Sequence, residues 1–568
     1  MKSVSAILSL VTLLGACSAA PEEASFDPRK VTSSVDSWAI EQEVQALRPQ
    51  LGLLTEALLS SEVLNEAFMA LLKRGSPSLY ASLGRIQRFE LHVEQAVLRD
   101  DLKKIEVLIS FEALLGEQES EAVQGLSHLS FERDESSQDW TLVDWLSREE
   151  RSEERTSPLF IESLADSVDE PLLLALRRSV HEEKITDVLA ERERDWNHAL
   201  EFESFDRHPG MAVSDVDGNG WDDIYITPRW GSNQLLLNKG GRFYESASSW
   251  GLDLNDHSTS AVFADLDNDG DPDLILGRSL VPSQIFENTG SRFVPVDHAP
   301  LPALVSSVAV ADVNADGLLD VYFSTYAASM IERIRDIGGA IEENAEQTLT
   351  GFLSVSEAKE LASAMADERF EFYLERPGPR NRLLLNQGGF RFEKPDGVLD
   401  VEMMKNTYQA SFSDIDGDSD MDLYLANDFS PNALFENDGS GGFLDITAQS
   451  KTEDFGFGMG VSWGDYDRDG RFDLYVSNMY SRTGQRMMSR TEDSDPRLAK
   501  AARGNSLFRN EEDRFSRSSG LREGLLVERA GWSWGGQFVD INNNGLLDLY
   551  VPNGYYSAPK EAALDRDT

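Results

Sequence analysis

The residues best suited to chemistry in this sequence are aspartates that recur at fixed spacing within a short loop. In the loop 465–473, carboxylates occupy positions 1, 3, 5 and 9, and Gly470 at position 6 permits a sharp turn. Hard cations such as Ca²⁺ take about six to eight oxygen ligands, and alternate side chains of a tight loop can converge on one ion. The spacing therefore predicts a calcium site.

The same spacing occurs six times, and we predict a Ca²⁺ site at every copy. The predicted ligands at positions 1, 3, 5 and 9 are Asp215, Asp217, Asn219 and Asp223; Asp265, Asp267, Asp269 and Asp273; Asp312, Asn314, Asp316 and Asp320; Asp414, Asp416, Asp418 and Asp422; Asp465, Asp467, Asp469 and Asp473; and Asp540, Asn542, Asn544 and Asp548.

Ligand charge predicts an order of affinity among the six loops. The loops at Asp265 and Asp465 have four carboxylates and a glycine at position 6, so we expect them to bind tightest. The loop at Asp414 should follow, because Ser419 replaces the glycine and costs on the order of 1 kcal/mol if its φ is positive. The loops at Asp215 and Asp312 come next, and the loop at Asp540, with two carboxylates, should be weakest.

These loops are not EF-hands. An EF-hand needs flanking helices and a bidentate glutamate at position 12. Position 12 is apolar in every copy: Ile226, Leu276, Phe323, Leu425, Val476 and Val551. Alternating, β-rich residues follow each loop, so each loop is predicted to join the two strands of a hairpin.

From about residue 200 to 556 the chain reads as one repeating unit. Apart from two stretched intervals, the loops recur every 47 to 51 residues. A second signature, Asn-x-Leu-Leu-Leu-Asn or a close variant, follows each of the first five loops, and a Gly-rich turn and a Phe-containing strand come after it; the five copies are 233–238, 284–288, 381–386, 432–437 and 505–510. Four strands in a unit of this length predict a propeller blade.

The repeated unit resembles FG-GAP/VCBS repeat proteins of the cartilage acidic protein (ASPIC/UnbV-related) family and the propeller of integrin α-subunits. The segments 455–464 and 532–536, each before a metal loop, look like the blade openings of that group. The resemblance implies a mainly β, integrin-α-like β-propeller with calcium on one face, used as an extracellular binding or adhesion module. Six blade repeats are visible, behind a small α+β domain.

The sixth repeat is half a blade. After Val551 no Asn-x-Leu-Phe-x-Asn strand occurs before Thr568. Two interpretations remain open. The ring closes as an irregular six, with a strand at 200–205 contributing to closure, or a complete chain continues to a seventh blade; we favour the second.

The first residues predict export and lipid anchoring. A basic start and a short apolar run through residue 16 are typical of a signal peptide. Leu14-Gly15-Ala16-Cys17 resembles the bacterial lipobox, and Cys17 is the only cysteine in the chain. The alternative is an ordinary signal peptide with a chance cysteine. We predict lipidation at Cys17, a tether over 17–30, and a bacterial cell-envelope location, at the outer membrane.

Residues 31–199 are predicted to form a separate α+β domain with a helical C-terminal part. Leucines and phenylalanines at three- and four-residue spacing predict one or two helices over 36–73. Alternating segments at 89–93, 105–111, 129–132 and 140–145 predict strands. This order resembles the cystatin-like cone of SnoaL-like domains, which often hold a pocket. The alternative is that the domain is a spacer or docking domain.

Two insertions, at about 327–378 and 482–503, interrupt the link between a blade's second and third strands. They should therefore rise from the rim opposite the metal loops, where loops on a rigid scaffold commonly bind partners. The second insertion is basic within a chain of net charge −48 and offers candidate ligand-binding residues for an anionic glycan, lipid headgroup or acidic partner: Arg482, Arg486, Arg490 and Arg497. A solvated loop paired with acidic neighbours is the alternative.

The net charge would repel nucleic acid phosphates, which argues against a nucleic acid partner. The sequence contains no HExxH, GxSxG, Walker or CxxCH motif. His208 and His257 lie in or near the repeats but in no catalytic pattern. Two hypotheses follow: a lipid-anchored, calcium-binding propeller that binds a surface protein or glycan, or a carbohydrate-active or other hydrolytic enzyme on the same scaffold.

Overall fold

The computed structural model describes residues 37–60, 66–99, 103–116, 121–133, 139–154, 163–178, 209–229, 231–297, 300–328, 330, 341–366, 375–395, 399–481, 496–512, 514–520 and 527–554. Cys17, Arg482, Arg486, Arg490 and His208, and the predicted signal peptide, tether and closing strand, lie outside these residues. The chain forms two compact units, one built mainly from residues before 162 and the other mainly from 162–480 and 500–566.

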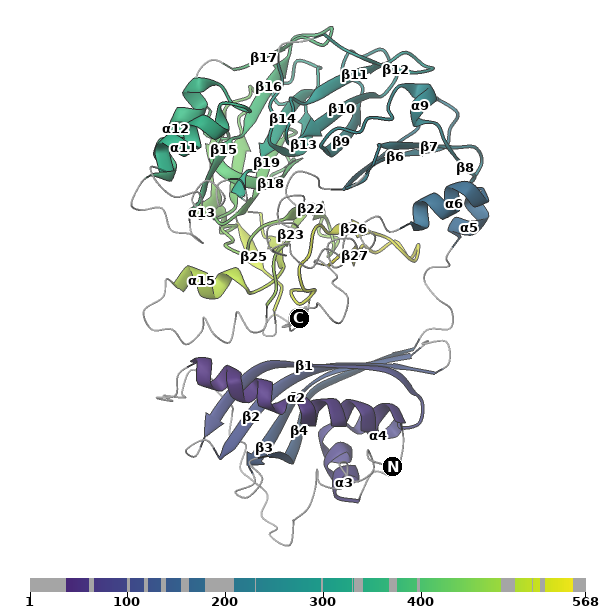
Figure 1. Ribbon diagram of the computed structural model, residues 1–568, viewed down its shortest axis with the longest axis vertical. Helices are drawn as coiled ribbons and strands as arrows, with labels where there is room; N and C mark the ends of the chain where they lie inside the picture. Colours follow the sequence, from purple (N-terminus) through teal and green to yellow (C-terminus); the bar gives the residue numbers. More distant parts are fainter. Residues whose placement is uncertain are drawn as a thin grey trace, which may run out of the picture. The chain divides into compact units, whose positions relative to one another are not determined.

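The N-terminal unit contains helices followed by one antiparallel sheet (Figure 1). The helices are α2 (Ser37–Ser60), α3 (Glu66–Gly75) and α4 (Pro77–Ala81). The strands, which pair in sequence order, are β1 (Ile86–Arg99), β2 (Lys104–Leu115), β3 (Glu121–Arg133) and β4 (Trp140–Glu154). This order of helices and then strands is the predicted α+β layout.

One hydrophobic cluster holds the N-terminal unit together. Helix α2 packs on β1 and β4, and its Leu47 and Leu54 belong to one buried cluster with Phe131 and Trp145 of the sheet. The approach of α3 to β4 is close, because a β-carbon added at Gly75 would lie only 1.9 Å from Trp145 Cδ1. No described helix is long and apolar enough to cross a membrane.

The second unit is a succession of antiparallel blades. Blade 1 is β5 (Gly210–Ser214), β6 (Asp223–Thr227), β7 (Gln234–Asn238) and β8 (Phe243–Glu245); blade 2 is β9 (Ser258–Ala264), β10 (Asp273–Arg278), β11 (Gln284–Asn288) and β12 (Phe293–Pro295); blade 3 is β13 (Val305–Ala311), β14 (Asp320–Thr325), β16 (Arg382–Asn386) and β17 (Phe392–Glu393).

Blade 4 is β18 (Met404–Ser413), β19 (Asp422–Asp428), β20 (Ala433–Asn437) and β21 (Phe443–Asp445), joined at its inner edge by β15 (Pro377–Arg380); blade 5 is β22 (Gly460–Gly464), β23 (Asp473–Ser477), β24 (Ser506–Asn510) and β25 (Phe515–Arg517). The half-blade is β26 (Gln537–Val539) and β27 (Asp548–Tyr550). Single-turn helices α9 (Ala247–Trp250) and α13 (Thr447–Ser450) follow blades 1 and 4.

The first strands of consecutive blades contact one another, so the blades follow around a common centre as in a propeller (Figure 1). The core is divided accordingly. Four hydrophobic clusters among the described residues each join two neighbouring blades, from blades 1 and 2 through blades 4 and 5. The alternating strand pattern explains this, since each sheet sends apolar side chains to both faces. The predicted mainly β, propeller-like fold is confirmed.

Helices cover two parts of this unit. Helices α5 (Leu164–Ser167) and α6 (Glu170–Arg177) pack Val168 and Leu172 on Leu236 of blade 1, on the face that points away from blade 2. The first insertion contains α11 (Ile341–Leu349) and α12 (Val355–Met365), which form a small cluster with Leu304 and Ala327. It leaves blade 3 at the end of β14, opposite the metal loop. Helix α15 (Pro496–Ala501) belongs to the second insertion and includes Arg497.

Candidate metal centres

All six aspartate-rich loops join the first and second strands of a blade, as the sequence predicts. The aspartate at position 9 is the first residue of the second strand in each case: Asp223, Asp273, Asp320, Asp422, Asp473 and Asp548. Each loop is thus attached to strand backbone at both ends, which limits the movement of its side chains.

The backbone of each loop is left-handed at two positions. At position 6, Gly470 has φ of 88° and Ser419 has φ of 78°, so the serine does occupy the strained conformation considered from the sequence. Position 4 is also left-handed, with φ of 63° at Arg468. Sequence reasoning missed position 4, although glycine or asparagine stands there in four of the six loops.

Hydrogen bonds within the loops turn the carboxylates inward. In the second loop, Asp265 Oδ1 accepts the backbone N–H of Asp269 at 3.1 Å, and its Oδ2 accepts that of Gly270 at 3.0 Å. Asp267 Oδ1 also accepts the Asp269 N–H, at 3.2 Å. Closely matching bonds occur in the first, third, fifth and sixth loops. The side chains at positions 1 and 3 therefore lie close together.

The aspartate at position 9 lies deeper than the others. Asp273 is 1% exposed; its Oδ2 accepts the N–H of Leu266 at 3.0 Å and its Oδ1 accepts the N–H of Asn288 at 2.9 Å. Burial raises the pKa of Asp273 and Asp422 to about 7 and that of Asp320 and Asp473 to about 6. A nearby cation would lower these pKa values, because it favours the charged form.

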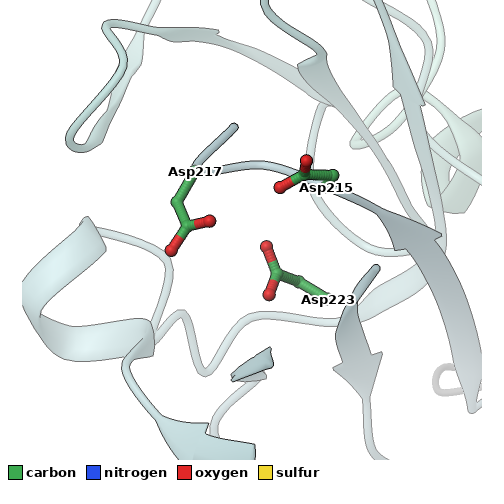
Figure 2. A group of neighbouring side chains, drawn as sticks. All are labelled: Asp215, Asp217 and Asp223. Atoms are coloured by element: carbon green, nitrogen blue, oxygen red, sulfur yellow. The ribbon is translucent and has the colours of Figure 1, made fainter. Parts of the chain in front are cut away.

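Four loops bring three carboxylates within 4.8 Å of one another. The groups are Asp215, Asp217 and Asp223; Asp265, Asp267 and Asp269; Asp414, Asp416 and Asp422; and Asp465, Asp467 and Asp473. Figure 2 shows the first group, with three carboxylates from the two ends of the loop turned toward one another. Oxygen donors of this number and type fit a hard divalent cation. No such group is found in the described loops at Asp312 and Asp540, where asparagine occupies position 3.

Arginines oppose the charge of the fifth loop. Arg509 of β24 forms ion pairs with Asp467 and Asp469, and Arg471 pairs with Asp469. In the described structure no cation pairs with the carboxylates of the loop at Asp265. On charge alone, the second loop should therefore bind a cation more tightly than the fifth. Counting carboxylates in the sequence does not reveal this difference, because both loops have four.

In blades 2 to 5, the last asparagine of the third strand links neighbouring blades; we call it the signature asparagine. Its side-chain amide donates to the position-2 carbonyl of the aspartate-rich loop in the preceding blade at 2.8 to 2.9 Å: Asn288 to Val216, Asn386 to Leu266, Asn437 to Val313 and Asn510 to Ile415. Its own N–H donates to the position-9 carboxylate of its own blade. The sequence showed this asparagine as a repeat but did not reveal its partners.

A model of the FG-GAP-like repeat family matches residues 215–276 and 414–476. Each matched segment begins at position 1 of one metal loop and ends at position 12 of a later one, so the family's repeat is in register with the hairpins described above. This chain contains FG-GAP-like repeats.

The chain is also similar to cartilage acidic protein 1 of Xenopus tropicalis, with 24% identity over 254 residues. The match covers 38% of this chain and 39% of that relative, so it spans about two fifths of the relative's length. This similarity agrees with the family expected from the blade openings.

A cavity of about 330 Å³ lies between the first insertion and blades 3 and 4, lined in part by Phe352, Leu361 and Met404. Two carboxylates at its wall are engaged by arginines: Glu357 pairs with Arg382, and Glu360 pairs with Arg380. These pairs attach α12 to β16 of blade 3 and to β15, at the edge of blade 4.

His257 precedes β9 with φ of 27°, and its carbonyl accepts the N–H of Ser279 at 3.0 Å.

Proposed function

We propose that this chain is a calcium-stabilised β-propeller that acts as a binding or adhesion module at the bacterial cell envelope, anchored by lipid at Cys17. Its partner is a surface protein or a glycan. FG-GAP-like repeats suggest an integrin-like binding propeller. The observation that carries the calcium part is the convergence of three carboxylates in four of the hairpin loops.

Calcium in these loops would stabilise the scaffold and leave the opposite rim for partners. Positions 1, 3, 5 and 9 would supply side-chain oxygens, and the left-handed backbone at positions 4 and 6 is already in place. Each bound ion would neutralise carboxylates that otherwise repel one another. Calcium binding should therefore make the hairpins more rigid and stabilise the folded propeller.

Calorimetry tests the metal assignment. Asp267→Ala removes a ligand from the loop expected to be tightest, and Asp548→Ala removes one from the loop expected to be weakest. At about 0.1 mM free Ca²⁺, near the weak end of protein sites, the first variant should lose one bound ion and the second none. Loss from the second variant alone would overturn the ranking, and no calcium uptake by the unmodified protein would overturn the assignment.

Glycan and protein arrays test the binding role. The full chain with Cys17→Ser is screened with Ca²⁺ and with chelator, and binding should require Ca²⁺. Glutamate at Arg482, Arg486, Arg490 and Arg497 should weaken binding of an anionic partner, whereas Arg242→Glu, at an exposed turn on the metal-loop side, should not. Equal loss in both variants would exclude the second insertion as the contact surface.

A further inference from the structure

Two of the six aspartate-rich loops have asparagine followed by glycine at positions 5 and 6. The pairs are Asn219-Gly220 in the first loop and Asn544-Gly545 in the sixth, whereas the other four loops have aspartate at position 5. A third such pair, Asn553-Gly554, lies outside the loops. Because glycine has no β-carbon, its backbone nitrogen can approach the side-chain amide of the preceding asparagine closely.

The first loop holds its pair in an arrangement that suits attack of that nitrogen on the amide. Asn219 Oδ1 accepts the backbone N–H of Trp221 at 2.9 Å, so the side-chain amide is folded back over the peptide of Gly220. A donor at this oxygen also stabilises the negative charge that attack on Cγ develops there. The N–H of Gly220 donates to Asp215 Oδ2 at 2.7 Å, so a carboxylate lies where the attacking nitrogen must release its proton.

The sixth loop has both of these hydrogen bonds. Asn544 Oδ1 accepts the N–H of Leu546, and the N–H of Gly545 donates to Asp540 Oδ2, each at 2.7 Å. Asparagine and glycine are exposed in both loops, so water reaches them. The pair outside the loops differs, because the N–H of Gly554 donates to a backbone carbonyl, that of Trp532, at 3.0 Å. An amide carbonyl is too weak a base to take up that proton.

We propose that Asn219 and Asn544 are sites of spontaneous deamidation, which converts position 5 of these two loops to aspartate or isoaspartate. The nitrogen of the following glycine forms a bond to Cγ of the asparagine, and its proton passes to the neighbouring carboxylate. The bond from Cγ to Nδ2 then breaks, and the side-chain nitrogen leaves with that proton as ammonia. Water opens the resulting succinimide ring at either of its two carbonyls, which gives the two products.

The two products change the first loop in opposite ways. Aspartate at position 219 gives this loop four carboxylates and a glycine at position 6, the same set as the loops at Asp265 and Asp465. Isoaspartate adds a carbon atom to the main chain and shortens the side chain, so it displaces the oxygens at positions 5 and 9. The effect on calcium rests on the proposed function, whereas the loss of ammonia does not.

Peptide mass spectrometry tests the reaction in the full Cys17→Ser chain, aged without calcium below its melting temperature and, in parallel, unfolded in guanidinium. Asn219 and Asn544 should lose ammonia at least as fast in the folded chain as in the unfolded chain, because the folded loops supply the carboxylate. Asn553 should react more slowly in the folded chain. Slower reaction of Asn219 and Asn544 on folding would overturn the proposal.

Asn314 is the matched control within the same samples. Its Oδ1 also accepts the N–H of the residue two places later, at 3.2 Å, but alanine follows it in the sequence. It should remain intact while Asn219 reacts. Equal loss of ammonia at Asn314 and Asn219 would contradict the assignment of the reaction to the Asn-Gly pairs.

Asp215→Asn tests the role of the carboxylate. The substitution preserves the shape of the side chain but removes the group that takes up the proton. The loss of ammonia should slow at least about tenfold at Asn219 and stay unchanged at Asn544, which has its own carboxylate. An unchanged rate at Asn219 would show that the loop does not promote the reaction.

Asn219→Asp tests the consequence, since this variant carries one of the two products. Calorimetry should show calcium binding at the first loop tightened at least about threefold, because ligand charge helps set affinity. Asn553→Asp is the control and should leave calcium binding unchanged. Equal affinities in both variants, with ammonia loss observed, would overturn the consequence alone. No calcium uptake by the unmodified chain would instead overturn the proposed function.

Discussion

The two units of this chain reach stability by different routes. The N-terminal unit has long strands, such as β1 with 14 residues, and one continuous cluster of apolar side chains behind them. The propeller has short strands, such as β8 with 3 residues, and its apolar core is divided between blades. Between those small cores lie buried polar groups, among them Asp320 and Asn386 at 0% exposure.

The comparison shows what a repeated architecture requires. A single core can rely on apolar burial, which contributes roughly 25 cal/mol for each Å² removed from water. A propeller must also satisfy carboxylates and amides at every blade, because an unpaired buried polar group costs about 1 to 3 kcal/mol. We therefore expect the propeller, but not the N-terminal unit, to depend on cations.

Removal of calcium should give the largest difference between the units. Each occupied site stabilises the native state by about 2.7 kcal/mol at a hundredfold excess of ion over Kd. Several sites together should shift the propeller's melting temperature strongly and leave the N-terminal unit unchanged. Hydrogen exchange read on peptides from 37–154 and from 209–554, with Ca²⁺ and with chelator, separates the two responses. Equal responses of both units would contradict the comparison.

Trp145→Ala should produce the opposite asymmetry. Trp145 is 0% exposed and packs against Phe68 and Gly75, so its loss should destabilise the N-terminal unit by about 3 to 5 kcal/mol. Leu146→Ala is the control, because Leu146 is 43% exposed on the same strand. Calcium-dependent protection of the propeller should be the same in both variants. A loss of that protection with Trp145→Ala would mean that the units are energetically coupled.

Asn386→Ala should weaken the propeller at one junction. The Asn386 side chain donates to Leu266 O and Leu319 O and accepts from Gly388 N. Leaving these groups unpaired should cost about 1 to 3 kcal/mol and increase exchange in blades 2 and 3 first. Asn268→Gly removes an exposed link to Gly317 at a left-handed residue, so chemical denaturation should show a change within about 0.5 kcal/mol. Equal effects would indicate that burial of the link is unimportant.

Protonation of His128 should have the smallest effect, and it should fall on the N-terminal unit. Burial lowers the pKa of His128 to about 4, against 6.5 when unfolded, with a further contribution from Arg148. The contribution of neutral His128 to the free energy of unfolding is fully present above pH 6.5. It is lost as the pH falls toward 4, because in that range only the unfolded chain takes up the proton. Since His128 is only half-buried, we expect about 1 kcal/mol or less. His128→Gln should remove this pH dependence, and an unchanged slope in that variant would assign it to another group.

The regular features of the fold were predictable from the sequence. Residue types at fixed spacing predict the six loops, their hairpins and the half-blade. The prediction works because every repeat has the same local sequence pattern and so the same local structure. The positive φ at Ser419 could be anticipated because glycine stands there in the other loops. The ligand assignments themselves stay predictions, as do the lipid anchor and the partner.

Other features depend on contacts between distant residues. The ion pair of Arg509 with Asp467 joins a third strand to a loop about forty residues earlier in the chain. No local sequence pattern predicts this pair. Strand β15 has proline at its first and third residues, and proline disfavours a β-strand. The strand forms because it pairs with β18. Strand β4 continues through a charged segment to Glu154. This segment has no alternation of apolar residues, and pairing with β3 keeps it in the strand.

The side-chain hydrogen bonds of the signature asparagines all run in the same direction along the chain. Each of the four side-chain bonds described runs backward, from a later blade to the loop of an earlier one. A metal loop is therefore fully braced only after the following blade has folded. In a chain that emerges from its N-terminus, as during synthesis, each aspartate-rich loop would receive this hydrogen bond one blade behind the growing end.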